Sequence, residues 1–508
     1  MAASQTVVVG AGLAGLSAAI HLAAAGRDVV VVEAEAVPGG RCGTATVGGY
    51  RFDTGPSVLT MPEVVRATVG AAGEELEDWL ELAPLDPTYR LTFHDGSRLD
   101  VLPGAERMAA EVERLAGPEE AARYLAFRDH LGRMLAAEWD QFIDRNYDGP
   151  ADLARPLALL RLARLGGFRR LHNLVATHLT DWRLRRAHTF QALYTGLSPF
   201  DALGIYAVVA QMDTVGGAWF PRRGGMHALA LALAGVAEKA GAALRLSTRV
   251  ERVEGGPQGV TGVVLAGGER LPARDVVVTS DLPAAYQHLL PPAARDWRVQ
   301  RRRLHFAPSC YLVHLGLPRR LEGQAHHTVH LGRDWKATFE ALTRHGGIQP
   351  DPSLLVTYPS PEDPDAAPPG HATLFVLEPT ANTRAGLDWA EVGPRLRERL
   401  YGRLAGLGYG DLRRDSAVEL VVDPPAWEAQ GLSAGTPFSL DHRFSQTGWL
   451  RPGNASATVP GLGFAGMGTV PGVGVPMVLI SGRLAAERVL ARGVRGLKEP
   501  SGRLRRAG

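Results

Sequence analysis

The chain opens on a buried strand, a helix and a second buried strand. Residues 6–9 are four consecutive β-branched residues, a pattern typical of a parallel strand that is covered on both faces. Residues 13–25 are rich in Ala and Leu and predict a helix that ends at Gly26. The apolar run 28–32 predicts the second strand. A strand–helix–strand start of this kind predicts a protein of the α/β class.

The rest of the chain alternates short strand patterns with longer helical ones, which predicts a second domain of mixed composition. Helical periodicity covers 104–139, interrupted by the breaker Gly117–Pro118, and returns at 387–407. Strand patterns bounded by Gly and Pro lie at 244–250, 260–265, 276–280, 306–316 and 372–378. From about residue 488 the chain becomes basic and rich in Gly, Pro and Ser, and 491–508 is expected to be a disordered tail.

Length and composition narrow the class of protein. The 508 residues are about three times the length of a typical domain, so two or more packed units are expected. With 45% hydrophobic and 21% charged residues, the composition is that of a globular protein. The 55 basic and 53 acidic residues leave a net charge of +2, so no overall field draws the protein to nucleic acid, and no nucleic-acid partner is expected.

Cys42 and Cys310 are the only cysteines of the chain. Two thiols so far apart cannot form a disulfide framework or a cysteine metal cluster, no metal site is expected, and the chain suits a reducing compartment. No apolar run of about 18 residues is free of charge and clustered glycine, so no transmembrane helix is predicted. We therefore expect a cytoplasmic protein.

The turn between the first strand and helix has the G-x-G-x-x-G spacing of a dinucleotide-binding loop. Gly10 permits the tight turn, Gly12 lets the backbone approach a pyrophosphate, and Gly15 lets the helix pack closely on the strand. The N-terminus of the helix then faces the anionic pyrophosphate. Glu33 ends the second strand, in the place of an acid that accepts hydrogen bonds from a ribose 2′-hydroxyl. Together these features predict a Rossmann-type βαβ domain that binds FAD or NAD.

A second glycine-rich loop follows, and it indicates which of the two dinucleotides is the cofactor. Gly39, Gly40 and Arg41 come shortly after Glu33, and the run Gly55-Pro56-Ser57 comes next. A simple turn is the alternative interpretation of the glycine pair. The Gly-Gly-Arg loop resembles the second fingerprint of the amine-oxidase-like flavoproteins. That resemblance implies FAD as the cofactor, with Arg41 on its pyrophosphate and the glycine pair beside the flavin.

Later motifs resemble the bacterial and fungal phytoene desaturase family. They lie at 190–200 (FQALYTGLSPF), 217–221 (GAWFP), 224–229 (GGMHAL), 325–328 (AHHT) and 463–476 (GFAGMGTVPGVGVP). The likeness spans about residues 6–488 and is closest to the actinobacterial-type phytoene desaturases. It implies an FAD-dependent carotenoid desaturase that introduces double bonds into phytoene by hydride transfer to the flavin N5, giving lycopene or a shorter desaturation product.

The last motif departs from the family pattern at one position. Many members have His between its Thr and Pro, where this chain has Val470. A mechanism that makes that histidine the base is therefore in conflict with this sequence. The glycines for close backbone approach remain, so flavin binding is still expected.

The resemblance also implies an amine-oxidase-like flavoprotein architecture. A discontinuous Rossmann-type FAD-binding domain would alternate with a mixed α+β substrate domain that carries a helical cap at about 105–200. The FAD-binding domain would comprise 1–85, 225–290 and 455–490, and the substrate domain 86–224 and 291–454. Further cofactor contacts are implied at Gly55, Pro56, Ser57, Val250, Gly466, Gly468, Thr469 and Val475. Val250, at the end of the strand 244–250, would approach the adenine through its backbone.

Desaturation requires a hydride acceptor and a proton acceptor, and the flavin supplies the first. Asp152 and Arg155 match an acid and an arginine proposed near the flavin in the family, and they are the expected catalytic pair. One helical turn apart, they are predicted to share a helix face. The alternatives are an ordinary stabilising pair at a helix N-terminus and a role for His326 and His327 as proton acceptors.

The segment Leu153–Thr180 is basic and apolar and contains no acidic residue. Its arginines are Arg155, Arg161, Arg164, Arg169 and Arg170. A basic amphipathic helix is typical of a membrane-surface element, and a solvated cap helix is the alternative. Because phytoene and related C40 polyenes dissolve only in lipid, we expect this helix to hold the enzyme peripherally at the cell membrane. Oxygen or a quinone is expected as the electron acceptor.

Three other activities fit parts of the same pattern. Another carotenoid-modifying enzyme, a hydroxycarotenoid desaturase or a ketolase, would share every cofactor motif. An amine oxidase would need an aromatic pair before the last motif, and no clear pair is present. A non-enzymatic prenyl-binding protein of the same fold would not need the complete set of flavin motifs that this chain has.

Overall fold

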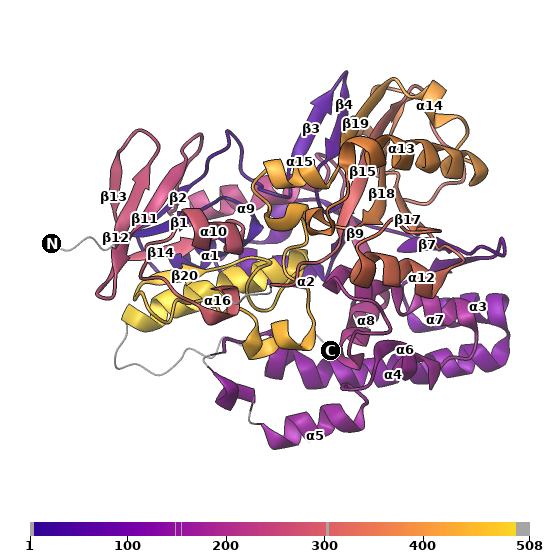
Figure 1. Cartoon of the computed structure of the whole chain (residues 1–508), viewed down its shortest axis with the longest axis horizontal. Helices are drawn as coiled ribbons and strands as arrows, with labels where there is room; N and C mark the ends of the chain where they lie inside the picture. The colour runs from indigo at the N-terminus through magenta and orange to yellow at the C-terminus, as the bar shows by residue number, and fades with distance from the viewer. Residues whose placement is uncertain (1–4, 148, 154, 301–303, 494–508) are drawn as a thin grey trace.

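The computed structural model describes residues 5–147, 149–153, 155–300 and 304–493 (Figure 1). Within these residues the chain forms two regions, one built on a parallel sheet and the other on a larger mixed sheet (Figure 1). Helices from the indigo-to-magenta part of the chain lie below the mixed sheet in this view.

A five-stranded parallel sheet forms the centre of the first region, with the strand order β10-β2-β1-β14-β20. Its strands are β1 (Thr6–Val9), β2 (Val29–Val32), β10 (Ala243–Arg245), β14 (Asp275–Val278) and β20 (Leu462–Phe464). Every residue of β1, β2 and β14 is buried, because both faces of the sheet are covered. This is why the sequence of these strands is almost continuously apolar.

Helices cover one face of this sheet and a small β-layer covers the other. The helices are α1 (Leu13–Ala24), α2 (Pro62–Gly70), α9 (His227–Lys239) and α16 (Val475–Gly493), and they share one hydrophobic core. The β-layer consists of β11 (Val250–Gly256), β12 (Gly259–Leu265) and β13 (Arg270–Pro272), and α10 (Leu282–His288) and α11 (Trp297–Gln300) pack beside it. Elements from the beginning, middle and end of the chain therefore meet around one sheet.

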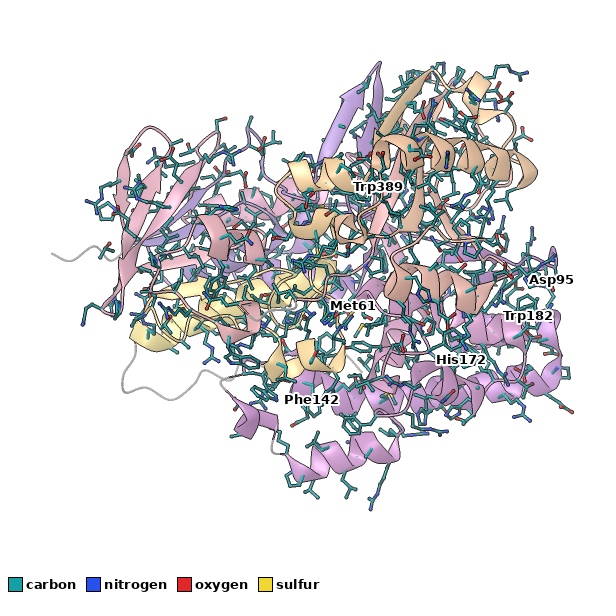
Figure 2. All side chains as sticks on the ribbon, in the orientation of Figure 1. Met61, Asp95, Phe142, His172, Trp182 and Trp389 are labelled. Carbon is teal, nitrogen blue, oxygen red and sulfur yellow. The ribbon has the colours of Figure 1, made fainter. Side chains whose placement is uncertain are left out.

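A seven-stranded mixed sheet forms the second region, with the order β19-β15-β18-β17-β16-β7-β8. Its strands are β7 (Tyr89–Thr92), β8 (Arg98–Val101), β15 (Ser309–Leu317), β16 (His327–His330), β17 (Leu354–Thr357), β18 (Ala372–Thr380) and β19 (Val418–Val422). The pair β16–β7 is parallel and the other neighbours are antiparallel. Helix α13 (Trp389–Gly406) packs on this sheet through buried side chains that begin with Trp389 (Figure 2).

Smaller elements complete the two regions. The helices are α12 (Trp335–Glu340), α14 (Leu412–Asp415) and α15 (Pro424–Ala429); the strands are β3 (Thr44–Val47) paired with β4 (Tyr50–Asp53), and β9 (Ala218–Pro221) between β5 (Leu59–Thr60) and β6 (Leu82–Pro84). Short 3₁₀ turns lie at Leu76–Asp78, Pro150–Leu153, Phe190–Thr195, Gly204–Tyr206, Pro364–Ala366, Thr383–Ala385, Ser433–Gly435, Phe444–Gln446 and Gly448–Leu450, and π-helical turns at Trp139–Ile143 and Ala341–His345.

Six helices in the first half of the chain form the helical cap. They are α3 (Ala105–Ala116), α4 (Pro118–Glu138), α5 (Pro156–Arg164), α6 (Leu171–Ala176), α7 (Trp182–Ala187) and α8 (Ala207–Val215). As the sequence predicts, Gly117–Pro118 separates two helices. Pro118 is the first residue of α4, a position at which the backbone N–H that proline lacks would make no intrahelical hydrogen bond. The cap shares a core with the β7–β8 edge of the mixed sheet, and Figure 2 marks His172 and Trp182 among its helices.

The prediction of a single basic helix at Leu153–Thr180 is wrong. The segment is divided into α5, a turn and α6. The break falls at Gly166, which adopts a φ of +79°, a conformation that glycine tolerates best. A β-carbon on Gly204 would lie 2.5 Å from the Gly166 carbonyl oxygen, so the turn is packed tightly against a neighbouring segment.

Two other predictions need correction. The strand predicted at 244–250 ends at Arg245, and the next strand, β11, begins at Val250 in a different sheet. Helix α16 continues to Gly493, so residues 491–493 of the predicted tail are helical, and 494–508 lie outside the described residues. None of the helices in the described ranges combines the length and the apolar character needed to cross a bilayer.

Candidate flavin site

The first glycine loop, residues 10–15, connects β1 to α1 with the geometry that the spacing predicts. A β-carbon on Gly15 would lie 2.0 Å from the Gly10 carbonyl oxygen, so only glycine permits this contact between helix and strand. Gly10 adopts a φ of +103°. Gly12 differs, because a β-carbon there would meet no atom closer than 3.9 Å. The backbone of Gly12 is thus accessible to a ligand at the N-terminus of α1.

The second glycine loop, residues 38–41, lies directly against the first. The amide of Gly39 donates a 2.9 Å hydrogen bond to the carbonyl of Ala11. Gly12 and Gly39 form an isolated parallel bridge, and a β-carbon on Gly40 would lie 3.2 Å from the Gly12 Cα atom. The two loops that the sequence separates by more than twenty residues therefore form one continuous backbone surface.

Glu33 stands at the end of β2, beside this surface. Its carboxylate is buried and accepts hydrogen bonds from the amides of Ala11, at 2.7 Å, and Glu35, at 2.9 Å. These amides fix the carboxylate at the edge of the first glycine loop. A carboxylate in that position is suited to a ribose hydroxyl, because it keeps acceptor sites beyond the two that the amides occupy.

Arg41 places a cation next to the two loops. Its Nε atom is buried and has no hydrogen-bond partner among the described residues. The guanidinium lies 3.7 Å from an oxygen of Asp281, and burial lowers the pKa of Arg41 in spite of that carboxylate. The Arg41 side chain is 26% exposed, and a partly buried guanidinium with an unpaired donor is suited to an anionic ligand such as a pyrophosphate.

The segment Gly55–Ser57 packs behind the second glycine loop. A β-carbon on Gly55 would lie 1.8 Å from the Arg41 carbonyl oxygen, so the two backbones are in direct contact. The Thr54 amide donates a hydrogen bond to the Gly43 carbonyl in the same contact. Ser57 is buried, and Pro56 between them is partly buried. Any role of these residues at the flavin stays a prediction.

The third part of the site is the closing loop, residues 466–474, which leads into α16. Gly466 lies near the first loop, with an added β-carbon 4.0 Å from Cβ of Ala14. Thr469 donates to the Gly466 carbonyl and contacts the hydroxyl of Ser481. Gly468 packs against Leu282, and Val475 begins the helix.

Arg451 fixes the closing loop, a role that could not be predicted from the sequence. It is fully buried, and its guanidinium donates to five carbonyl groups, two of which belong to Met467 and Thr469 in the closing loop. The other three are those of Leu440, Asp441 and Gln446. A single arginine thus connects two chain segments, and its position in the motif WLRPGN carried no spacing signal by which it could be found.

These residues fit FAD. The accessible Gly12 backbone and the guanidinium of Arg41, whose Nε donor has no partner among the described residues, would hold the pyrophosphate, and Glu33 would hold the ribose. The closing loop and the N-terminus of α16 would complete the site at its other end. Val250 begins β11 instead of ending a strand of the parallel sheet, and its backbone contact with the adenine stays a prediction. The neighbouring Thr248 is the residue whose amide bonds the Glu33 carbonyl, at 2.7 Å.

The expected catalytic pair, Asp152 and Arg155, is not paired as predicted. Asp152 lies in the 3₁₀ turn Pro150–Leu153 and Arg155 caps α5, so the two do not share one helix face. Asp152 accepts a hydrogen bond from the Gly149 amide and lies 3.6 Å from Arg145. Arg155 donates to Gln141. Their catalytic role stays a prediction.

His326 and His327 lie at the start of β16, in the interior. Nδ1 of His326 lies 2.7 Å from a carboxylate oxygen of Glu362, and Nδ1 of His327 lies 2.9 Å from the hydroxyl of Thr357. Burial lowers the pKa of His326 to about 3 and raises the pKa of Glu362 to about 7. Burial also holds the pKa of His327 well below its usual value, so both imidazole rings are neutral near pH 7.

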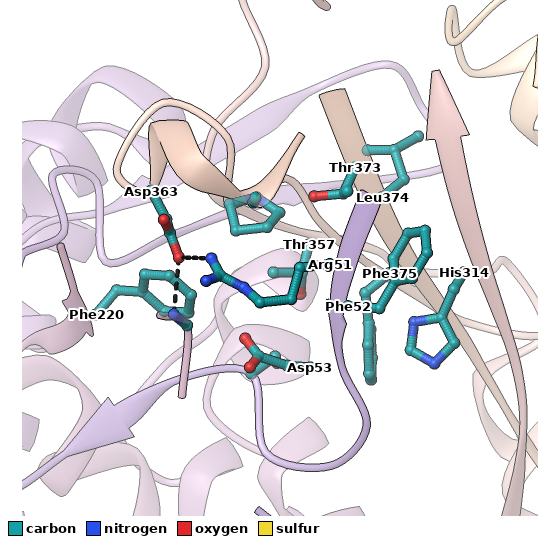
Figure 3. A pocket seen from close by; sticks show the side chains of 14 residues that line it. Arg51, Phe52, Asp53, Phe220, His314, Thr357, Asp363, Thr373, Leu374 and Phe375 are labelled. Carbon is teal, nitrogen blue, oxygen red and sulfur yellow. Dashed lines mark hydrogen bonds and ion pairs between the residues drawn. The ribbon is translucent and has the colours of Figure 1, made fainter. Parts of the chain in front are cut away.

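Beside this pair lies a small cavity, lined by both charged and apolar side chains, between β4 and the mixed sheet (Figure 3). Arg51 forms an ion pair with Asp363, which also accepts a hydrogen bond from the Gly225 amide at 2.7 Å. Burial raises the pKa of the neighbouring Asp53 to about 7. The cavity measures about 20 Å³, which is room for a single water and not for a polyene.

Comparison with known proteins identifies relatives along almost the whole chain. The chain is 49% identical to a phytoene dehydrogenase of Streptomyces griseus, over 96% of this chain and 95% of that one. It is 38% identical to a zeta-carotene-forming phytoene desaturase of Myxococcus xanthus, over 96% and 94% of the two chains. A lycopene-forming phytoene desaturase of Pantoea ananas is 31% identical over 96% and 99%.

Solved structures share the fold at much lower identity. An oxidoreductase from Methanosarcina mazei aligns with a TM-score of 0.61 at 15% identity, covering 94% of this chain and 98% of that one. A putrescine oxidase variant aligns with a TM-score of 0.60 at 17% identity, covering 96% and 99%. The predicted amine-oxidase-like α/β architecture is therefore confirmed.

The fold and the joined glycine loops define an FAD-dependent oxidoreductase. The model of the flavin containing amine oxidoreductase family matches residues 13–490, and the chain belongs to that family, among its phytoene desaturases. The family, the cofactor FAD and the enzyme class predicted from the motifs are confirmed.

Proposed function

We propose that this carotenoid desaturase takes phytoene, or a closely related C40 polyene, and converts it to lycopene or a shorter desaturation product. The observation that carries the proposal is the 49% identity with the Streptomyces griseus phytoene dehydrogenase over nearly the full length of both chains. The relatives include both zeta-carotene-forming and lycopene-forming enzymes. The number of desaturation steps is therefore the property that the experiment must measure.

When bound, FAD supplies the hydride acceptor for the desaturation. The chain holds the cofactor through the two glycine loops, Arg41 and Glu33, and it must orient the polyene and exclude water. For the proton that leaves the neighbouring carbon we propose Asp152 as the acceptor, with Arg155 as its partner in the reaction. Asp152 is accessible for this, because its side chain is 29% exposed.

The alternative acceptors, His326 and His327, are less suited. Both are fully enclosed, and each already uses one ring nitrogen in a side-chain contact. If Asp152 accepts the proton, Asp152→Asn lowers turnover by about a hundredfold or more while FAD content stays normal. Normal turnover in Asp152→Asn, together with loss of turnover in His326→Gln, would transfer the role to the histidine.

We further propose that the enzyme binds peripherally to a membrane through α5 and passes its electrons to oxygen or a quinone. Helix α5 lies at the lower edge of the molecule (Figure 1) and buries only Leu162 among its described side chains. Leu157 is 81% exposed and Leu160 is 46% exposed, and Arg161 and Arg164 are exposed on the same helix. An exposed helix with leucines and arginines is typical of a membrane-surface element.

A basic hollow beside α5 supports the same orientation. It has a volume of about 410 Å³ and is lined by residues of α4, α5 and α8. Three of the lining side chains are arginines, Arg128, Arg133 and Arg161, and one, Asp129, is acidic. A hollow with this charge is suited to the headgroups of anionic lipids.

Expression in a phytoene-accumulating bacterium tests the main proposal. Pigment analysis of the cells should show lycopene or an intermediate such as ζ-carotene, and a Gly12→Val variant, which we expect to lose the cofactor, should leave phytoene unchanged. Unchanged phytoene with a flavin-loaded parent enzyme would contradict the substrate assignment. Supplying hydroxycarotenoids or lycopene to the same enzyme then distinguishes the other carotenoid-modifying activities. Anaerobic assays with an added quinone distinguish the two electron acceptors.

A further inference from the structure

A buried histidine from outside the closing loop packs directly on that loop. A β-carbon on Gly472 would lie 2.1 Å from Cε1 of His442 and 2.5 Å from its Nε2 atom. The imidazole therefore rests on the Gly472 backbone, which has a φ of +134°. Both features require glycine at 472, and together they fix the ring against the loop.

The position of His442 is determined by neighbours on several elements. Its amide donates a 2.9 Å hydrogen bond to the Thr195 carbonyl, and its carbonyl accepts one of 2.8 Å from the Tyr206 hydroxyl. The rings of Tyr206 and His442 are perpendicular, with centroids 5.9 Å apart. Arg451 bonds the preceding carbonyls of Leu440 and Asp441 as well as the closing loop. His442 and Gly472 are thus held in one rigid arrangement.

The imidazole is a hydrogen-bonding group without a partner in the chain. His442 is 7% exposed, and its Nε2 atom is buried with no hydrogen-bond partner among the described residues. Burial and the nearby Arg451 hold the pKa of His442 well below its usual value, so the ring is neutral near pH 7. A neutral imidazole offers one N–H donor and one acceptor nitrogen.

The closing loop itself carries no hydrogen-bonding side chain next to His442. Between Thr469 and Val475 its sequence is Val-Pro-Gly-Val-Gly, without a polar side chain. We propose that His442 supplies this group from the neighbouring segment and hydrogen-bonds the bound flavin through Nε2. The inference rests on the closing loop contacting the flavin, which is part of the predicted site.

Such a hydrogen bond would act on the flavin itself, so the test measures the flavin and the reaction separately. His442→Phe keeps a flat ring and removes both nitrogens. We expect it to retain FAD, to shift the visible absorption bands and the reduction potential of the bound flavin, and to lower turnover by roughly tenfold, the ratio that one net hydrogen bond contributes. His442→Gln, whose amide reaches about as far as Nε2, should restore the parent spectrum and most of the rate.

A matched control comes from a second buried histidine. His314 in β15 is 1% exposed, both of its ring nitrogens lack partners among the described residues, and it packs on Phe52 and Phe375 instead of on the closing loop. His314→Phe should therefore leave the flavin spectrum and potential as in the parent. An equal shift in His314→Phe would overturn the specific role of His442.

Three further results would contradict the inference. The first is a flavin-loaded His442→Phe with unchanged spectrum, potential and turnover. If that variant does not fold, His442→Gln and His442→Met are compared, and identical flavin properties in these two overturn it as well. The third is normal flavin content in both Gly466→Val and Gly474→Val, which would show that the closing loop is not at the flavin and would remove the basis of the inference without bearing on the enzyme class.

Discussion

The amide of Gly39 donates a hydrogen bond of 2.9 Å to the carbonyl of Ala11, and this bond joins the two glycine loops of the site. Because of it, the position of the first loop depends on the second, and a change in either alters the common backbone surface. Although the two loops lie against each other, a β-carbon added to Gly12 would meet no atom closer than 3.9 Å. The two loops therefore form a ligand cradle that side chains leave open.

Gly12→Val should fold and lose its flavin. The added side chain meets no atom of the chain closer than 3.9 Å at its Cβ position, but it occupies the place where a pyrophosphate approaches the backbone. We expect the purified variant to carry less than about a tenth of the parent's FAD, measured by its visible absorbance, with a normal circular dichroism spectrum.

Two glycine variants are the controls for this prediction. Gly70→Ala, where an added β-carbon meets no atom within 4 Å, should keep its flavin, whereas Gly15→Ala should impair folding itself because its β-carbon would lie 2.0 Å from Gly10. Full flavin occupancy in a folded Gly12→Val protein would contradict the assignment of the first glycine loop.

Arg41→Lys should weaken FAD binding without unfolding the chain. Lysine keeps the positive charge but cannot reproduce the planar fork of a guanidinium, and the unpaired, buried Nε donor of Arg41 is lost. Titration of the apoprotein should show a dissociation constant raised by roughly ten- to a hundredfold. Arg66→Lys, at an exposed ion pair with Glu77, is the control and should bind FAD as the parent does. An unchanged affinity in Arg41→Lys would show that the guanidinium does not contact the pyrophosphate.

Arg451→Lys should destabilise both the apoprotein and the flavin site. A fully buried guanidinium that donates to five carbonyls has no equivalent in lysine, and several of those carbonyls would lose their partners. We expect the free energy of unfolding to fall by about 3 kcal/mol or more in urea titrations. Arg443→Lys, at a partly exposed pair with Asp441, should cost less than about 1 kcal/mol. Equal effects of the two substitutions would contradict the bridging role of Arg451.

The sequence predicted the first βαβ unit almost residue by residue, because its signal is local. Residues 6–9 form β1 and the helix predicted to Ala25 ends at Ala24, since apolar runs and glycines specify these elements without long-range help. The dipeptide Gly117–Pro118 is a local signal of the same kind, and it predicted the break between two helices of the cap. The meeting of Gly12 with Gly39 follows less directly, from the resemblance of the second loop to a known fingerprint.

Features that depend on contacts between distant segments could not be predicted. The helix expected at Leu153–Thr180 has a continuous pattern, but Gly166 turns the chain there, and the turn packs against Gly204. Arg451 and His442 have no motif of their own, and their roles follow from the carbonyls and the glycine that lie beside them after folding. Val250 was expected at the end of the strand that starts near Leu244, but that strand ends at Arg245 and Val250 begins β11 in another sheet.

Asp53 should make the stability fall as the pH rises from about 4 to 7. Burial raises its pKa in the folded protein to about 7, above its ordinary value of 3.8, so the folded state holds a proton that the unfolded state has released in this range. One such proton corresponds to a loss of up to about 1.4 kcal/mol of unfolding free energy per pH unit, and the loss ends above the folded-state pKa.

Asp53→Asn removes this titration, so its stability profile between pH 4 and 7 should be flatter than the parent's in urea titrations. Asp86→Asn, at an exposed pair with Arg107, is the control and should leave the slope unchanged. Parallel profiles for the parent and Asp53→Asn would show that the carboxyl titrates alike in both states.

Binding to anionic membranes should depend on α5. The arginines of the segment Leu153–Thr180 differ in their contacts. Arg170 donates a hydrogen bond to the Asp201 carbonyl and so stabilises the fold, whereas Arg161 and Arg164 are exposed on α5 and available to lipid headgroups. Each exposed arginine contributes about 1 kcal/mol at an anionic surface, so Arg161→Gln with Arg164→Gln should lower vesicle binding by up to roughly thirtyfold. Raised salt should have a similar effect on the parent, because such attraction is screened.

The apolar half of the interaction is tested separately. Leu157→Gln with Leu160→Gln removes exposed leucines without changing charge, and should weaken binding to neutral and anionic vesicles alike. Arg395→Gln with Arg413→Gln, on α13 and α14 at the opposite edge of the molecule (Figure 1), is the charge-matched control and should sediment with vesicles as the parent does. All variants should keep full flavin content, since α5 contributes no residue to the glycine loops. If both α5 pairs sediment with anionic vesicles as well as the parent, α5 is a solvated cap helix and the polyene enters from another face of the enzyme.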